Sequence, residues 1–246
     1  MRVSTRDLCR RLLSCALLWA LASAADATPL VVGGFTFDAG EVAFADDAYL
    51  VSGTVGHTCN ARSTPASSVA EALSGSDVLR CVNNTLSTPG VVEVRFLDNS
   101  IENGSGADLI IFELSGPLPP GTADPRERFG VSVLYAGGFS AFSFFDPVAT
   151  GINTGADPTL DIFAAQIDLS AFAVPIGESV DSIRLDIRNN NLGTRSADIA
   201  ALGAIHSAQP IPEPAPLIEV ILGLVAISLI RRMLRSTGHR QQALTN

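Results

Sequence analysis

Short apolar runs with a period of two residues recur through the middle of the chain and constrain its fold most strongly. In residues 182–188 (SIRLDIR), the apolar Ile183, Leu185 and Ile187 alternate with charged residues. Such alternation is typical of strands that present one face to a core. We expect strands at residues 35–38, 41–44, 49–54, 91–98, 108–114, 129–135, 139–145, 182–188 and 197–205.

Turn-forming Gly, Asn, Asp and Pro residues separate these runs, and no repeat of fixed period or strand–helix alternation is present. Residues 160–169 fit either a strand or a helical turn, and residues 67–73 are the best helical candidate. The pattern predicts an all-β fold, an antiparallel two-sheet β-sandwich of the jelly-roll kind. All 12 Phe lie between residues 28 and 210, where they can supply the core.

The N-terminus has the three parts of a secretory signal. Four Arg residues in the first 11 positions precede an apolar run at 12–21 (LLSCALLWAL), and two A-x-A sites end at Ala24 and Ala27. The run has about ten residues, whereas a membrane-spanning helix needs about 20. We expect residues 1–27 to be removed after export through the secretion translocon by signal peptidase. A buried N-terminal helix is the alternative.

The C-terminus combines a stiff segment, an apolar run and an Arg pair. Residues 210–216 (PIPEPAP) favour an extended backbone, and residues 217–230 (LIEVILGLVAISLI) precede Arg231 and Arg232. An apolar run ended by Arg is typical of a transmembrane helix with its basic end in the cytoplasm. The run is short and contains Glu219, so a hydrophobic helix packed on the domain is the alternative.

These C-terminal residues resemble the PEP-CTERM protein-sorting signal: Pro212, Glu213 and Pro214, then the apolar helix, then Arg231 and Arg232. The resemblance implies a bacterial protein that an exosortase processes near the Pro-Glu-Pro motif after a transient stay in the inner membrane. It also implies a link to exopolysaccharide and biofilm. We therefore expect three parts, a signal peptide (1–27), a β-sandwich domain (28–210) and a sorting signal (211–246).

The charge balance differs between these parts. The whole chain carries a formal charge of −9, and its 16 basic residues are all Arg. Residues 28–210 hold 8 Arg against 21 acidic residues, so the expected domain is more acidic than the whole chain. Such a surface repels nucleic acid phosphates and excludes that class of partner. It suits an extracellular protein and, in places, a calcium site.

Two of the four cysteines, Cys9 and Cys15, lie in the expected signal peptide. Cys59 and Cys81 remain in an exported domain, where disulfides persist, and we expect them to pair. Their spacing is not C-x-x-C, but a metal-binding or nucleophilic pair is the alternative.

The densest polar cluster is residues 98–108 (DNSIENGSGAD). If strands 91–98 and 108–114 are neighbours, Asp98 and Asp108 share one sheet end. Carboxylates and amides are calcium ligands. The candidate calcium ligands are therefore Asp98, Asn99, Asn103, Asp108 and Asp198. The alternative is that the Asp, Asn and Gly residues of this cluster are turn formers. Residues 96–113 and 197–205 are also similar to segments of other PEP-CTERM surface proteins and of galactose-binding-like sandwiches, so that fold is the alternative to a jelly roll.

Signals of catalysis are weak. Only His57 and His206 lie outside the C-terminal tail, and neither H-E-x-x-H nor G-x-S-x-G occurs. The only Trp lies in the expected signal, which argues against an aromatic sugar platform. We therefore expect a non-enzymatic, exported surface or matrix protein. A calcium-dependent carbohydrate- or ligand-binding module and a secreted hydrolase, with a carboxylate pair for glycoside hydrolysis, are the alternatives.

Overall fold

The computed structural model describes residues 28–57, 64–84, 90–155, 160–188 and 196–208. Within them the fold is all-β, and every strand pair is antiparallel. Its contacts divide the chain into two units, Met1–Ala208 and Gln209–Asn246. The described residues of the first unit have a β-sandwich architecture, as the alternating pattern predicts.

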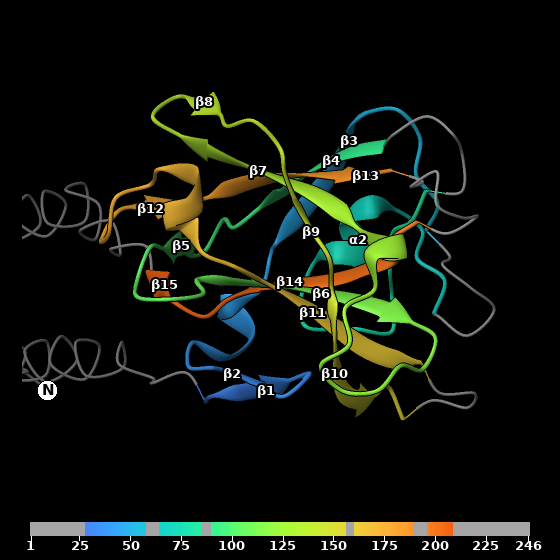
Figure 1. Ribbon diagram of the computed structural model, residues 1–246. Helices are drawn as coiled ribbons and strands as arrows, with labels where there is room; N and C mark the ends of the chain where they lie inside the picture. The colour runs from blue at the N-terminus through green and yellow to red at the C-terminus, as the bar shows by residue number, and fades with distance from the viewer. Residues whose placement is uncertain (1–27, 58–63, 85–89, 156–159, 189–195, 209–246) are drawn as a thin grey trace, which may run out of the picture. The chain divides into compact units, whose positions relative to one another are not determined.

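Two larger sheets form the two layers of the sandwich (Figure 1). One has the order β3-β4-β13-β7-β8, with β9 also paired to β7, and the other has the order β10-β11-β6-β14. The first sheet comprises β3 (Asp47–Ser52), β4 (Gly90–Arg95), β13 (Ser182–Ile187), β7 (Phe129–Tyr135), β8 (Gly138–Phe139) and β9 (Ser143–Phe145). The second comprises β10 (Val148–Asn153), β11 (Asp161–Ile167), β6 (Leu109–Ser115) and β14 (Ile199–Ala204).

The main core lies between these sheets. Val92, Val131 and Leu185 face it from the first sheet, and Ile111 and Leu202 face it from the second. All five side chains are completely buried. The period-two pattern thus places the apolar residues of each strand on the inner face, as it predicts.

A second apolar cluster covers the outer face of the four-stranded sheet. The hairpin of β1 (Leu30–Val32) and β2 (Phe35–Phe37) and the 3-10 helix η1 (Gly40–Ala43) contribute to it. The rings of Phe37 and Phe44 pack in a tilted arrangement, with 4.6 Å between their centroids. Because β6 has an apolar layer on both faces, all seven of its residues are buried.

A small three-stranded sheet lies at one end of the sandwich. It has the order β12-β5-β15, from β12 (Ser179–Val180), β5 (Ser100–Glu102) and β15 (Ser207–Ala208). Two further 3-10 helices are η2 (Pro125–Glu127) and η3 (Leu169–Phe172).

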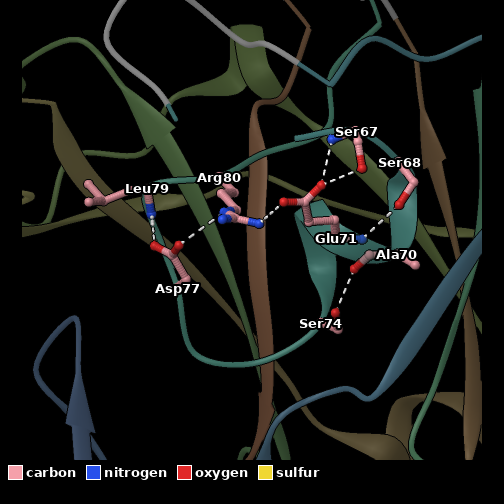
Figure 2. Close-up of polar contacts among 8 residues, drawn as sticks. All are labelled: Ser67, Ser68, Ala70, Glu71, Ser74, Asp77, Leu79 and Arg80. Atoms are coloured by element: carbon pink, nitrogen blue, oxygen red, sulfur yellow. Dashed lines mark hydrogen bonds and ion pairs between the residues drawn. The ribbon is translucent and has the colours of Figure 1, made fainter. Parts of the chain in front are cut away.

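The described residues contain one α-helix, α2 (Val69–Leu73), inside the range expected to be helical. Ser68 caps it, because its Oγ accepts a hydrogen bond from the backbone N–H of Glu71. Figure 2 shows that the Glu71 carboxylate reaches back to Ser67 and also binds Arg80. A helix of this length is too short to be stable alone. These contacts hold it on the core, where Leu73 is completely buried.

Two sequence predictions of strands need correction. Residues 41–44 are not a strand, because the Phe44 N–H closes a 3-10 turn on Glu41 and only Phe44 forms a bridge, to Gly203. Residues 139–145 form two short strands, β8 and β9, since the Ser140 hydroxyl accepts the hydrogen bond of Val133 N–H between them. The ambiguous segment 160–169 forms β11.

Several predictions fall on residues that the structure does not describe. The expected signal peptide, Cys59 and the sorting residues Pro212, Glu213, Pro214, Arg231 and Arg232 lie outside the described ranges. Within those ranges, no helix has the length and apolar character that crossing a membrane requires.

Candidate functional site

The pairing of β5 with β15 brings His206 next to Asp108, two residues that are far apart in the sequence. The N–H of Glu102 donates to the carbonyl of His206, and the N–H of Ile205 donates to the carbonyl of Asp108. The side chains then meet, with 2.9 Å between His206 Nδ1 and Asp108 Oδ1. The backbone ladders therefore fix the position of both residues.

The Asp108 carboxylate is completely buried and held from three sides. In addition to His206, its Oδ1 accepts from the Gly104 N–H at 2.8 Å, and its Oδ2 accepts from the Leu169 N–H at 2.8 Å. The contact leaves Nε2 as the ring nitrogen of His206 that Asp108 does not bind. Asp108 thus orients the ring of His206.

Gly104 is required by this arrangement. A Cβ at this position would lie 2.3 Å from His206 Nδ1, because the ring packs directly on the Gly104 backbone. No other residue type fits without moving His206.

The imidazole borders an open pocket of about 310 Å³. The pocket is lined by Asp38, Ala39, Glu102, Gly104, Ile205, His206 and Ser207. The side chain of His206 is 36% exposed, so the ring is reachable while its Asp108 partner is not. Asp38 and Glu102 give the pocket two carboxylates.

The predicted calcium ligands Asn99 and Asn103 serve internal contacts. Asn103 is completely buried, and its Nδ2 donates to the carbonyl of Val174 at 2.6 Å and to Ser170 Oγ at 3.1 Å. Asn99 Nδ2 donates to Ser207 Oγ at 3.0 Å. These amides hold the small sheet and the η3 turn in place.

Asp98 and Asp108 do not share a sheet end, because β4 and β6 belong to different sheets. The shared sheet end required these two strands to be neighbours, and they are not. Asp98 instead lies beside Asp46, and Asp46 Oδ2 accepts a hydrogen bond from the backbone N–H of Asp98 at 3.2 Å. Burial raises the pKa of Asp98, and the negative charge of Asp46 raises it further.

Asp198 lies at a third place, beside the completely buried Glu113, whose Oε1 is 3.4 Å from the Asp198 N–H. Burial raises the pKa of Glu113 well above its ordinary value, and a hydrogen bond with Glu127 adds to this effect. In the described part of the chain, no group of three or more His, Cys, Asp or Glu residues can hold a metal ion. The candidate ligands thus occupy separate places, and calcium binding stays a prediction.

Cys81 is completely buried in the second apolar cluster. Its expected partner, Cys59, lies outside the described residues, so the pairing stays a prediction.

Sequence reasoning missed the site around His206. Two histidines outside the tail were too few to indicate a metal centre, and nothing in the spacing links Asp108 to His206. Glu113 carried a usable signal, since an acidic residue sits among the apolar residues of the run DLIIFEL. That signal becomes clear only when β6 is known to be buried on both faces.

Comparisons with known proteins found no matching family model, no matching curated protein and no matching solved structure.

Proposed function

We propose that this protein is an exported, non-enzymatic surface or extracellular-matrix protein that an exosortase sorts through its C-terminal PEP-CTERM signal. Its precursor crosses the inner membrane through the secretion translocon, loses residues 1–27 to signal peptidase and is held transiently by the C-terminal helix. The β domain then acts at the cell surface or in the matrix, in association with exopolysaccharide.

The observation that carries this proposal is the position of the Pro-Glu-Pro motif. The last described strand, β15, ends at Ala208, and Pro212 follows four residues later. The apolar run and the Arg231–Arg232 pair come next. Cleavage near the motif would leave all the described strands intact, which is what a sorted and released domain requires.

The finer fold assignment belongs to the same proposal. Two antiparallel sheets with a shared core favour a jelly-roll or galactose-binding-like sandwich. Among the described strands, β10 and β14 are the two ends of the four-stranded sheet, and β3 and β8 are the two ends of the strand order in the other sheet.

Processing tests the sorting part. The full chain is produced in a Gram-negative host with and without an exosortase, and the size and membrane retention of the product are followed by immunoblot. We expect a shorter product only with the exosortase. Glu213→Ala should abolish this shortening, and the matched variant Glu178→Ala, at an exposed turn of the sandwich, should process normally.

Accessibility tests the export part. Protease added to cells with a permeabilised outer membrane should digest a tag at the C-terminal end of the sandwich domain. Leu17→Arg, which places a charge in the N-terminal apolar run, should protect the tag by keeping the protein in the cytoplasm. A wild-type protein that stays in the cytoplasm contradicts the proposal, and processing that ignores Glu213→Ala contradicts its exosortase step.

A further inference from the structure

The pocket beside β5 and β15 presents negative charge and hydrogen-bond acceptors to a ligand. Asp38 and Glu102 line it with carboxylates, and His206 presents its imidazole. Asp108 binds Nδ1, so Nε2 is the ring nitrogen of His206 that Asp108 leaves uncontacted. The volume of the pocket, about 310 Å³, lies at the lower end of the range for small-molecule sites.

We propose that this pocket binds a primary ammonium group, carried by a small amine or by an amino sugar. An ammonium group has three N–H donors, no acceptor and a positive charge. It matches the two carboxylates that line the pocket better than an anionic ligand does. The acidic surroundings favour it further, since residues 28–210 hold 21 acidic residues against 8 Arg and attract cations.

The support behind His206 is what distinguishes this pocket from a surface hollow. The Asp108 carboxylate is completely buried, and burying a charged group is costly unless its hydrogen bonds are made. Two backbone N–H groups and the imidazole make them. A carboxylate needed only to hold the turn would be served by the backbone groups, and its third contact fixes the ring that borders the pocket.

A metal ion is a weaker fit than an ammonium group. Among the described residues no three His, Cys, Asp or Glu side chains are placed to hold a metal ion together. An ammonium group does not require ligands at fixed coordination distances, because its three donors can bind groups spread around a pocket.

Calorimetric titration of the full-length chain tests the proposal with matched probes. Glucosamine, N-acetylglucosamine and glucose share one ring and differ at one substituent, and putrescine carries ammonium groups without a ring. We expect glucosamine to bind about tenfold or more tightly than the two uncharged sugars, because a hydrogen bond between charged groups is worth about 1.5–3 kcal/mol. Binding of putrescine would show that the ammonium group alone is recognised, and its failure would assign the site to amino sugars.

Charge-neutralising variants locate the site. Glu102→Gln and Asp38→Asn should each weaken glucosamine binding about tenfold. The matched control is Asp181→Asn, which removes an exposed charge at a different pocket and should leave binding unchanged. Circular dichroism and the melting temperature establish that each variant is folded.

A glycine pair tests the positioning of His206. Gly104→Ala should displace the ring and weaken binding, whereas Gly138→Ala, where an added Cβ meets nothing within 4 Å, should not. The proposal is overturned if neither glucosamine nor putrescine binds more tightly than glucose, or if folded Glu102→Gln and Asp38→Asn bind as the wild type does. Because the titration uses purified protein, its failure leaves the sorting proposal intact, and a failure of sorting leaves the pocket intact.

Discussion

Arg184 on β13 binds Glu93 on β4, with 2.9 Å between Arg184 Nη2 and Glu93 Oε2. The two residues are direct partners in the strand register and lie on the outer face of the six-stranded sheet. The Arg184 guanidinium also lies over the ring of Phe139, 3.7 Å from its centroid. Glu93 is only 6% exposed, so this ion pair is shielded from water more than most surface pairs are.

We predict that Glu93→Gln destabilises the domain at neutral pH by about 1.5–3 kcal/mol, the value of hydrogen bonds to a charged group. The free energy of unfolding in urea measures this loss. Burial alone would raise the pKa of Glu93, but hydrogen bonds from Tyr49 and Arg184 outweigh it and lower the pKa.

The lowered pKa of Glu93 sets the pH dependence of this contribution. It is present above the unfolded pKa, about 4.3, and is lost as the pH falls through the lower folded pKa. Glu93→Gln should therefore lose stability less steeply in acid than the wild type does. Glu178→Gln removes the same charge at an exposed turn and should follow the wild-type curve. Identical acid curves for wild type and Glu93→Gln would contradict the prediction.

Glu113 has the opposite pH dependence. Burial and the hydrogen bond with Glu127 raise its pKa, so the folded state holds a proton that the unfolded state releases. The stability that depends on protonated Glu113 is fully present below the unfolded pKa, about 4.3, and is lost as the pH rises toward the folded pKa.

We predict that Glu113→Gln is more stable than the wild type at pH 8, by about 1–3 kcal/mol, because it is neutral at every pH. The amide keeps an acceptor oxygen for the Asp198 N–H and places an N–H donor where Glu113 Oε2 accepts no hydrogen bond. Urea unfolding at pH 5 and pH 8 measures the effect. The gap between the variant and the wild type should shrink at pH 5, and a variant that is less stable at both pH values would contradict the argument.

The sequence predicts the strands well because alternation is a local property. Ser182–Ile187 and Phe129–Tyr135 form strands where the pattern places them, since their apolar residues alternate along one face. The same reasoning fails for residues 41–44. Ala43, Phe44 and the following Ala45 are all buried, and consecutive buried residues fit a 3-10 turn but not a strand with one exposed face.

The candidate site depends on contacts that no local pattern contains. His206 meets Asp108 because β15 pairs with β5 and because Ile205 pairs with Asp108 through the backbone. Strand order decides such contacts, and a period-two pattern does not reveal which strands become neighbours. The same limitation explains why Asp98 and Asp108 were expected together and lie at strands of different sheets.

The cap of α2 gives a local stability prediction. Ser68→Ala removes the acceptor for the Glu71 N–H and should cost about 1 kcal/mol. For a domain of this size, that loss lowers the melting temperature by about 2–4 °C. Ser76→Ala is the matched control, since its hydroxyl binds Glu41 at the exposed surface and does not cap a helix. Equal melting temperatures for Ser68→Ala and the wild type would show that the core alone holds α2.

The last prediction concerns the packing of the β1–β2 hairpin and η1 on the four-stranded sheet. A Cβ at Gly203 on β14 would lie 2.5 Å from Phe37 Cε1 and 3.0 Å from Phe44 Cε1. Both rings are almost completely buried, so they have little room to move. Gly203→Ala should therefore destabilise the domain by about 1–3 kcal/mol through overpacking.

Gly138→Ala is the control for this variant, because an added Cβ there meets nothing within 4 Å. A second variant, Gly203→Ala with Phe37→Leu, separates the clash from any other effect of the alanine. Leucine lacks the ring edge that the new methyl group would strike, so it should cost less in the Gly203→Ala background than in the wild type. A double-mutant cycle of unfolding free energies measures this coupling. Strict additivity of the two changes would show that Phe37 does not limit the space at Gly203.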